Sequence, residues 1–254
     1  MIQSREAPWA VELVDFRKTF RPHWSRQPVV AVQGVTLHVA AGQVLGLLGP
    51  NGSGKSTTLK AMAGLLRPSA GVCRILGADP AVASARGFIG YAPESCRLSP
   101  HQTGREFLTY CAGLSGAGSD RVDATLAWSG LGHAADRRMT SYSKGMMQRV
   151  ALAQAVLADP PVVLLDEPTG GLDPAGRLAV GRLICELRAR GTTVVFTSHL
   201  LDHAEEGCDL IAILGQGRVL ALGTPDELMG GPRPATVQPS RLERLYLEKT
   251  GANG

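Results

Sequence analysis

Apolar runs of strand length recur along the chain, each bounded by polar or glycine-rich residues. Two of them, at 9–16 and 29–39, flank a polar segment with two prolines and predict an antiparallel layer. The later runs are continuously apolar, as in buried strands, and helical patterns come between several of them. Because strands that alternate with helices form parallel sheets, this order predicts a parallel sheet flanked by helices. The expected later strands are 44–48, 72–76, 88–91, 162–166, 192–197 and 210–214, and the expected helices among them are 55–66, 175–189 and 200–206.

A long helical stretch interrupts this alternation. From 103 to 158 the pattern is helical, with glycine-rich breaks at 113–118 and 130–132. We therefore expect an α/β fold: a parallel sheet flanked by helices, an N-terminal antiparallel β layer, and a helical subdomain inserted at about 95–158. One domain is expected to span 1–230, followed by a linker and a short C-terminal helix within 231–254.

Composition narrows the class of protein. The chain has 254 residues, of which 44% are hydrophobic, enough to bury the core of one large domain. A net charge of +4, with arginines spread along the chain, gives little support to nucleic-acid binding, and none is expected. Five cysteines without a Cys-x-x-Cys pair predict reduced thiols in a cytosolic protein rather than a disulfide framework or a zinc site.

The sequence also bears on membrane insertion. No apolar run approaches the roughly 20 residues that a spanning helix needs. The first residues lack the apolar core of a signal peptide. We therefore do not expect the chain alone to cross a membrane.

The most specific pattern lies between the expected strand 44–48 and the expected helix 55–66. It reads Gly-Pro-Asn-Gly-Ser-Gly-Lys-Ser-Thr, a phosphate-binding loop in its usual strand-to-helix context. Glycines let backbone amides encircle phosphates, Lys55 can bridge the outer phosphates, and Ser56 can ligate Mg²⁺. A glycine-rich turn without a ligand is the competing interpretation, which the flanking strand and helix disfavour. The pattern predicts a P-loop NTPase core whose nucleotide contacts are Gly49, Asn51, Gly52, Ser53, Gly54, Lys55, Ser56 and Thr57.

Two carboxylates stand at the carboxyl end of the expected buried strand 162–166. Asp166 and Glu167 would lie at the edge of the sheet where α/β proteins bind ligands. Asp166 can hold Mg²⁺ through water, and Glu167 can orient or deprotonate the water that attacks the γ-phosphate. His199, just after the next strand, would reach the same phosphates. The competing interpretation is two solvated acids in a strand-to-helix turn.

Further segments follow in a specific order. They are Tyr-Ala-Pro-Glu at 91–94, Tyr-Ser-Lys-Gly-Met at 142–146, Gly-Leu-Asp at 171–173, and His199. Together with the phosphate loop and the acidic strand end, they resemble the ATPase subunit of an ABC transporter over about residues 10–225. In that family these segments are the glutamine loop, the signature sequence, the aspartate loop and the switch histidine.

The resemblance implies a cofactor set and a dimer. ATP and Mg²⁺ would bind, with Ser56, Glu94 and Asp166 on the metal side and Lys55, Glu167 and His199 as the catalytic residues. Two ATPase subunits, expected to be identical, would meet head to tail. Ser143 and Gly145 of one subunit would then contact the γ-phosphate bound to the other. Phe20 lies where the family stacks an aromatic ring on adenine; Trp24 competes for that role, and a simple core position is the alternative for Phe20.

Membrane partners follow from the same resemblance. The chain would sit at the cytoplasmic face of the cell membrane as a peripheral subunit, docked on separate transmembrane permease subunits. The glutamate at 94, the signature Tyr-Ser-Lys-Gly-Met and the segment 242–248 resemble the branch that drives exporters of drugs, lipids or polysaccharides. Residues 133–138, read with 142–146, suggest a narrower match to the ATPase that helps mature the copper site of nitrous oxide reductase.

Two other functions remain open at this point. A soluble ABC-type ATPase of DNA repair or translation usually carries two ATPase domains or a long coiled-coil insertion, and neither pattern is present here. A nucleotide-binding scaffold without turnover is disfavoured because Lys55, Asp166, Glu167 and His199 all occur together.

Overall fold

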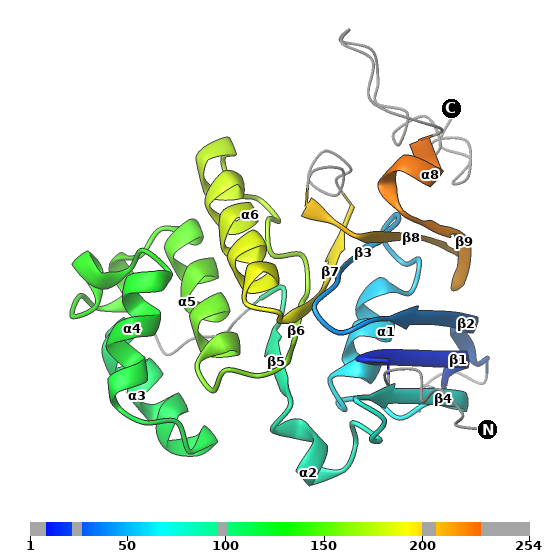
Figure 1. The fold of residues 1–254 in the computed structure, drawn as a ribbon, viewed down its shortest axis with the longest axis horizontal. Helices are drawn as coiled ribbons and strands as arrows, with labels where there is room; N and C mark the ends of the chain where they lie inside the picture. Colours follow the sequence, from blue (N-terminus) through cyan, green and yellow to red (C-terminus); the bar gives the residue numbers. More distant parts are fainter. Residues whose placement is uncertain (1–8, 22–26, 96–100, 200–206, 230–254) are drawn as a thin grey trace, which may run out of the picture.

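The computed structural model describes residues 9–21, 27–95, 101–199 and 207–229. Its strands form two sheets (Figure 1). One is antiparallel and has three strands in the order β2-β1-β4. The other has six strands in the order β5-β6-β7-β3-β8-β9, and only β9 runs antiparallel to its neighbour. The strands are β1 (Val11–Phe20), β2 (Val29–Val39), β3 (Val44–Leu48), β4 (Ala70–Ile75), β5 (Ile89–Ala92), β6 (Val162–Leu165), β7 (Thr193–Ser198), β8 (Leu210–Gly215) and β9 (Arg218–Gly223).

The central strands are covered on both faces, which explains their continuous apolar runs. Leu45 and Leu47 of β3 face the side covered by the antiparallel sheet and α1 (Lys55–Met62). Side chains alternate along a strand, so Val44 lies on the opposite face, where it packs with residues of α5 (Lys144–Val156) and α6 (Pro174–Ala189). The predicted α/β fold, with its parallel sheet and N-terminal antiparallel layer, is therefore confirmed.

A helical layer lies beside the sheet, opposite the antiparallel strands in Figure 1. It consists of α3 (Gly104–Ser115), α4 (Asp120–Trp128) and α5, and the short 3₁₀ turns η1 (Gly132–Ala134) and η2 (Met139–Ser141) lie between α4 and α5. These helices enclose a core of their own that includes Leu108, Leu126 and Val150. Because α5 packs on α3 and α4 with one face and on the sheet with another, it joins the helical layer to the sheet.

Some boundaries differ from those expected. β1 continues to Phe20, which pairs with Val29 of β2, and an irregularity at Asp15, at φ 46°, shifts the alternation of buried positions from Leu13 to Phe16. The helix after the phosphate loop ends at Met62, since Gly64 takes a left-handed conformation that closes it. The short helices α2 (Ala83–Arg86) and α8 (Pro225–Met229) were not expected.

Other expectations lie outside the described residues, namely the helix at 200–206 and the segment 231–254 with its linker and helix. Within the described ranges, the helices are too short or too polar to span a bilayer. The domain boundaries remain a prediction.

Gly90 allows α5 to lie close against β5. A Cβ atom added at Gly90 would stand 1.9 Å from the carbonyl oxygen of Ala155 in α5. We expect Gly90→Ala to lower the free energy of unfolding by about 1–3 kcal/mol, because strand and helix must separate to admit the methyl group. Gly113 is the matched control: it is exposed in α3, and a Cβ added there meets nothing within 4 Å.

Urea unfolding of both variants is the measurement. Gly113→Ala should raise stability by about 0.5–1 kcal/mol, because alanine favours the helix. Equal effects of the two substitutions would contradict the close packing of β5 on α5.

Candidate functional site

A cleft lies at the edge of the six-stranded sheet where β3, β6 and β7 end. These strands are neighbours and parallel, so the segments that follow them come together. The phosphate loop follows β3, the acidic pair follows β6, and His199 follows β7. The cleft has a volume of about 430 Å³ and is lined by Phe20, Val29, Val30, Ala31, Asn51, Gly52, Ser53, Gly54, Lys55, Ser56, Thr57, Glu94, Glu167 and His199.

The phosphate loop has the backbone that its glycines were expected to allow. Gly52 and Gly54 take φ of 80° and 101°, which residues with a Cβ atom rarely adopt. Gly54 caps α1, whose N-terminus has no side-chain cap and no acidic residue in its first turn. The first amides of a helix lack partners within the helix, so this end of α1 presents donors and positive potential to an anion.

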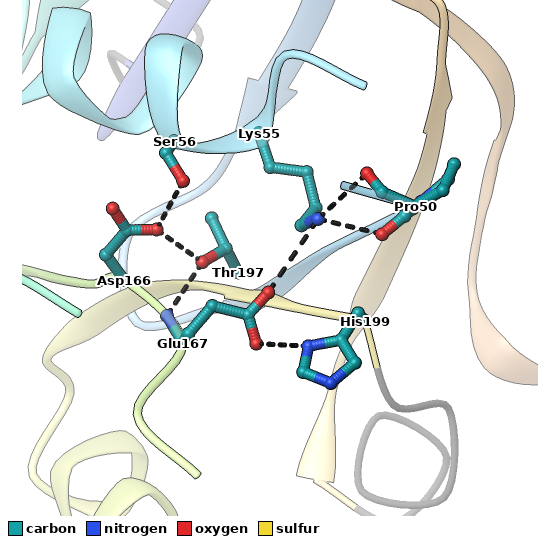
Figure 2. A network of polar contacts seen from close by, with 8 residues as sticks. Pro50, Lys55, Ser56, Asp166, Glu167, Thr197 and His199 are labelled. Atoms are coloured by element: carbon teal, nitrogen blue, oxygen red, sulfur yellow. Dashed lines mark hydrogen bonds and ion pairs between the residues drawn. The ribbon is translucent and has the colours of Figure 1, made fainter. Parts of the chain in front are cut away.

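Lys55 lies buried within the loop. Its ammonium donates to the carbonyl oxygens of Gly49 at 2.8 Å and Pro50 at 3.2 Å, and lies 3.7 Å from Oε1 of Glu167 (Figure 2). Burial lowers the pKa of Lys55, while the carboxylates of Glu167 and Asp166 oppose that shift. The loop thus holds a cation at its centre.

Asp166 joins the loop helix to the sheet. Its Oδ1 accepts hydrogen bonds from Oγ of Ser56 at 2.9 Å and from Oγ1 of Thr197 at 2.7 Å (Figure 2). The Asp166 backbone N–H also donates to the carbonyl of Ala92 at 2.9 Å, which ties the end of β6 to the end of β5. Asp166 is 3% exposed, and its partners fix its carboxylate beside the loop serine.

Glu167 is held at both carboxylate oxygens. Oε1 faces the ammonium of Lys55, and Oε2 lies 2.8 Å from Nδ1 of His199. Its backbone is strained: φ is 48°, and its N–H donates to Oγ1 of Thr197 at 2.8 Å. Non-glycine residues in this conformation occur at functional sites, where the surrounding structure maintains the strain.

The residues of the cleft fit a magnesium nucleotide. The buried hydroxyl of Ser53 has no hydrogen-bond partner within the described chain, so the loop retains an unused donor suited to a phosphate oxygen. Ser56 and Asp166 place hydroxyl and carboxylate oxygens 2.9 Å apart, and these are ligand types that Mg²⁺ prefers. In the described ranges, no three His, Cys, Asp or Glu residues form a metal-holding group. Mg²⁺ does not require one, because it commonly binds one or two carboxylates, waters and substrate phosphates.

The outer part of the cleft is apolar. Phe20, Val29 and Val30 form this wall, and each is more than a third exposed. The ammonium of Lys18 lies 5.3 Å from the centre of the Phe20 ring. An exposed ring at the mouth of the cleft can stack on a base, which favours that role for Phe20 over a core position. Trp24 falls outside the described residues.

Ser143 and Gly145 do not line this cleft. They line a second cavity of about 470 Å³, together with Gly171 and Asp173. Ser143 caps α5, with its Oγ accepting from the backbone N–H of Met146 at 3.2 Å. The structure therefore brings the predicted residues together in two groups: the phosphate loop with Glu94, Asp166, Glu167 and His199, and the signature segment with the aspartate loop.

Sequence reasoning missed Thr197. A threonine near the end of an apolar strand carries no signal of its own, since β-branched residues are common in strands. The sequence signal that could have identified Thr197 as a site residue is its position two residues before His199.

A family model, curated relatives and solved structures all relate this chain to ATP-binding proteins of ABC transporters. Residues 32–170 match the family described as ABC transporter. An ABC transporter ATP-binding protein of Nostoc sp. is 40% identical over 99% of this chain and 77% of its own length. The Nod factor export ATP-binding protein I of Burkholderia lata is 36% identical over 89% of this chain and 79% of its own. A dimeric ATP-binding cassette, solved in a post-hydrolysis state bound to ADP and Pi, superposes with a TM-score of 0.78 at 26% identity, covering 85% of this chain and 98% of that one.

Thr197→Val tests the buried network. Thr197 is fully buried, and valine keeps its shape but removes the hydroxyl. Asp166 then loses a donor and the Glu167 N–H loses its acceptor, so we expect stability to fall by about 1–3 kcal/mol and ATPase activity to fall with it. Thr197→Ser retains the hydroxyl and should restore most of both. Urea unfolding and phosphate release are the measurements; a valine variant as stable and active as the serine variant would contradict the assignment.

Proposed function

Because this chain belongs to the ABC transporter family as an ATP-binding subunit, we propose that its cleft binds ATP with Mg²⁺ and that Glu167 directs the hydrolysis. The chain is an ATPase that powers a transporter. A role in DNA repair or translation is therefore set aside. The observation that carries the proposed site is the convergence of Lys55, Asp166 and Glu167 in one cleft, with Lys55 and Glu167 3.7 Å apart.

Glu167 is the proposed general base. The water oxygen attacks the γ-phosphorus, the bond to the bridging oxygen of ADP breaks, and Glu167 accepts the water proton. Contacts with Lys55 and His199 fix the direction of its carboxylate. Lys55 is placed to balance charge on the outer phosphates, and His199 to hold Glu167 and approach the γ-phosphate.

Ser56, Asp166 and Glu94 are the proposed residues on the metal side. Their hydroxyl and carboxylate oxygens match the ligand preference of Mg²⁺. When bound, Mg²⁺ neutralises charge that develops on the phosphate oxygens. Glu94 stands where the family usually has glutamine, and we propose that it contributes a metal-side oxygen rather than a second general base.

A head-to-tail homodimer completes the proposed site. Ser143 and Gly145 lie at the start of α5, away from the residues that line the nucleotide cleft of their own chain. Their hydroxyl and amide, with the positive end of the α5 dipole, are suited to the γ-phosphate held by a second copy. A solved cassette that resembles this chain is dimeric, which supports the proposal of a dimer. Phosphate release would then remove a contact between subunits and let them separate.

We propose further that the dimer drives an exporter from the cytoplasmic face of the membrane, bound to permease subunits. Support comes from the similarity to a Nod factor export protein and from the exporter-like signature at 142–146. The segment 94–107 is the proposed permease-docking surface, although 96–100 lie outside the described residues. The narrower match to the nitrous oxide reductase maturation ATPase finds no support among the relatives named above and is not proposed.

Glu167→Gln tests the base and the dimer together. The amide cannot accept the proton, so we expect hydrolysis to fall by about 10²–10⁴-fold while ATP binding persists. The bound ATP should then hold two chains together on size-exclusion chromatography with MgATP. Lys55→Ala is the control, because without its phosphate-loop cation it should neither bind ATP tightly nor dimerise. A Glu167→Gln chain that hydrolyses normally and stays monomeric would refute both assignments.

Co-expression tests the membrane partner. A tagged chain, produced together with any permease whose gene adjoins its own, should purify with that permease from detergent extracts. Recovery of the tagged chain alone, with the permease present in the extract, would count against the proposed transporter complex.

A further inference from the structure

Tyr91 carries a buried hydroxyl with no hydrogen-bond partner in the described part of the chain. The residue lies on β5, and its ring packs against the core that includes Leu164 and α1. Tyrosine hydroxyls usually find a partner when buried, because an unmade hydrogen bond costs free energy. Phenylalanine would fill the same space without that cost, so packing alone does not explain the hydroxyl.

The sheet register places Tyr91 beside the acidic end of β6. Tyr91 pairs with Leu164, and Asp166 lies two residues after Leu164 on the same face. The hydrogen bond from Asp166 N–H to Ala92 holds the two strand ends together. Glu94 follows Tyr91 by three residues and lines the nucleotide cleft.

The Glu94 side chain is held less tightly than that of Asp166. Asp166 is buried and accepts two hydrogen bonds, whereas Glu94 is exposed and has no hydrogen bond or ion pair to another described residue. A Glu94 carboxylate that turns toward the metal side approaches the negative charges of Asp166 and Glu167. A neutral hydrogen-bond donor near the Glu94 carboxylate would offset that repulsion and fix the direction of the carboxylate.

Tyr91 can supply such a donor, because its buried hydroxyl has no partner among the described residues. Burial raises the pKa of Tyr91 to about 12, and the charges of Asp166 and Glu94 act in the same direction. At neutral pH the hydroxyl therefore keeps its proton and can donate it to a carboxylate.

We propose that Tyr91 is a positioning residue for Glu94: its buried hydroxyl donates a hydrogen bond to the Glu94 carboxylate when that side chain turns to the metal side of the cleft. This inference rests on the proposed function, in which Glu94 supplies a metal-side oxygen. Tyr91 is not among the residues that line the cleft, so its proposed effect on the metal side runs through Glu94.

Tyr91→Phe tests the inference, because it removes one oxygen atom. Without nucleotide, the thermal midpoint should stay the same or rise, since an unpaired buried donor has been removed. With ATP in the Glu167→Gln background, which does not turn over, the Mg²⁺ concentration for half-maximal thermal stabilisation should rise about tenfold, the scale of one hydrogen bond to a charged group. Tyr110→Phe is the matched control: Tyr110 is exposed on α3, so neither value should change.

A double-mutant cycle tests the route through Glu94. Tyr91→Phe combined with Glu94→Ala should need no more Mg²⁺ than Glu94→Ala alone, because the acceptor is already absent. Additive effects would overturn the proposal, as would an unchanged Mg²⁺ requirement in Tyr91→Phe or a lowered thermal midpoint without nucleotide.

The proposed function can fail separately from this inference. If Lys55→Ala still binds ATP, or the unmodified chain is not stabilised by MgATP, the nucleotide site itself is wrong. If those results hold and Tyr91→Phe behaves like Tyr110→Phe, only the role of Tyr91 is refuted.

Discussion

Two adjacent buried carboxylates set the main constraint on this structure. Asp166 and Glu167 are 3% and 7% exposed, and buried charges are tolerated only where donors and opposite charges surround them. Their partners come from α1, from β7 and from the residue after β7. These elements must therefore lie next to β6. The strand order and the polar network thus both follow from the need to surround two buried carboxylates with donors and a cation.

Local patterns explain what the sequence could predict. The phosphate loop, the buried strands and the acidic strand end each occupy a short stretch with its own chemical signature, and their positions followed from that stretch alone. Thr197 was missed because its role arises from the pairing of β6 with β7, which no local pattern records. The extension of β1 was missed for a similar reason: the irregularity at Asp15 changes the alternation that sequence analysis relies on.

Backbone strain contributes to the precision of the site. The left-handed conformation of Glu167 is held on one side by Thr197, which accepts its N–H, and on the other by Gly170, whose N–H donates to its carbonyl at 3.0 Å. The direction of the Glu167 side chain is thus imposed by the backbone as well as by Lys55 and His199. Such preorganisation reduces the reorientation that a reaction would otherwise require.

The short connection between α5 and β6 has a mechanical consequence. Ser143 stands at the start of α5, and Asp166 follows the end of β6, with only residues 157–161 between helix and strand. Two consecutive prolines, Pro160 and Pro161, stiffen that connection. Because α5 also packs directly on β6, a movement at the first turn of α5 would be passed to that buried strand both through this short link and through side-chain contacts.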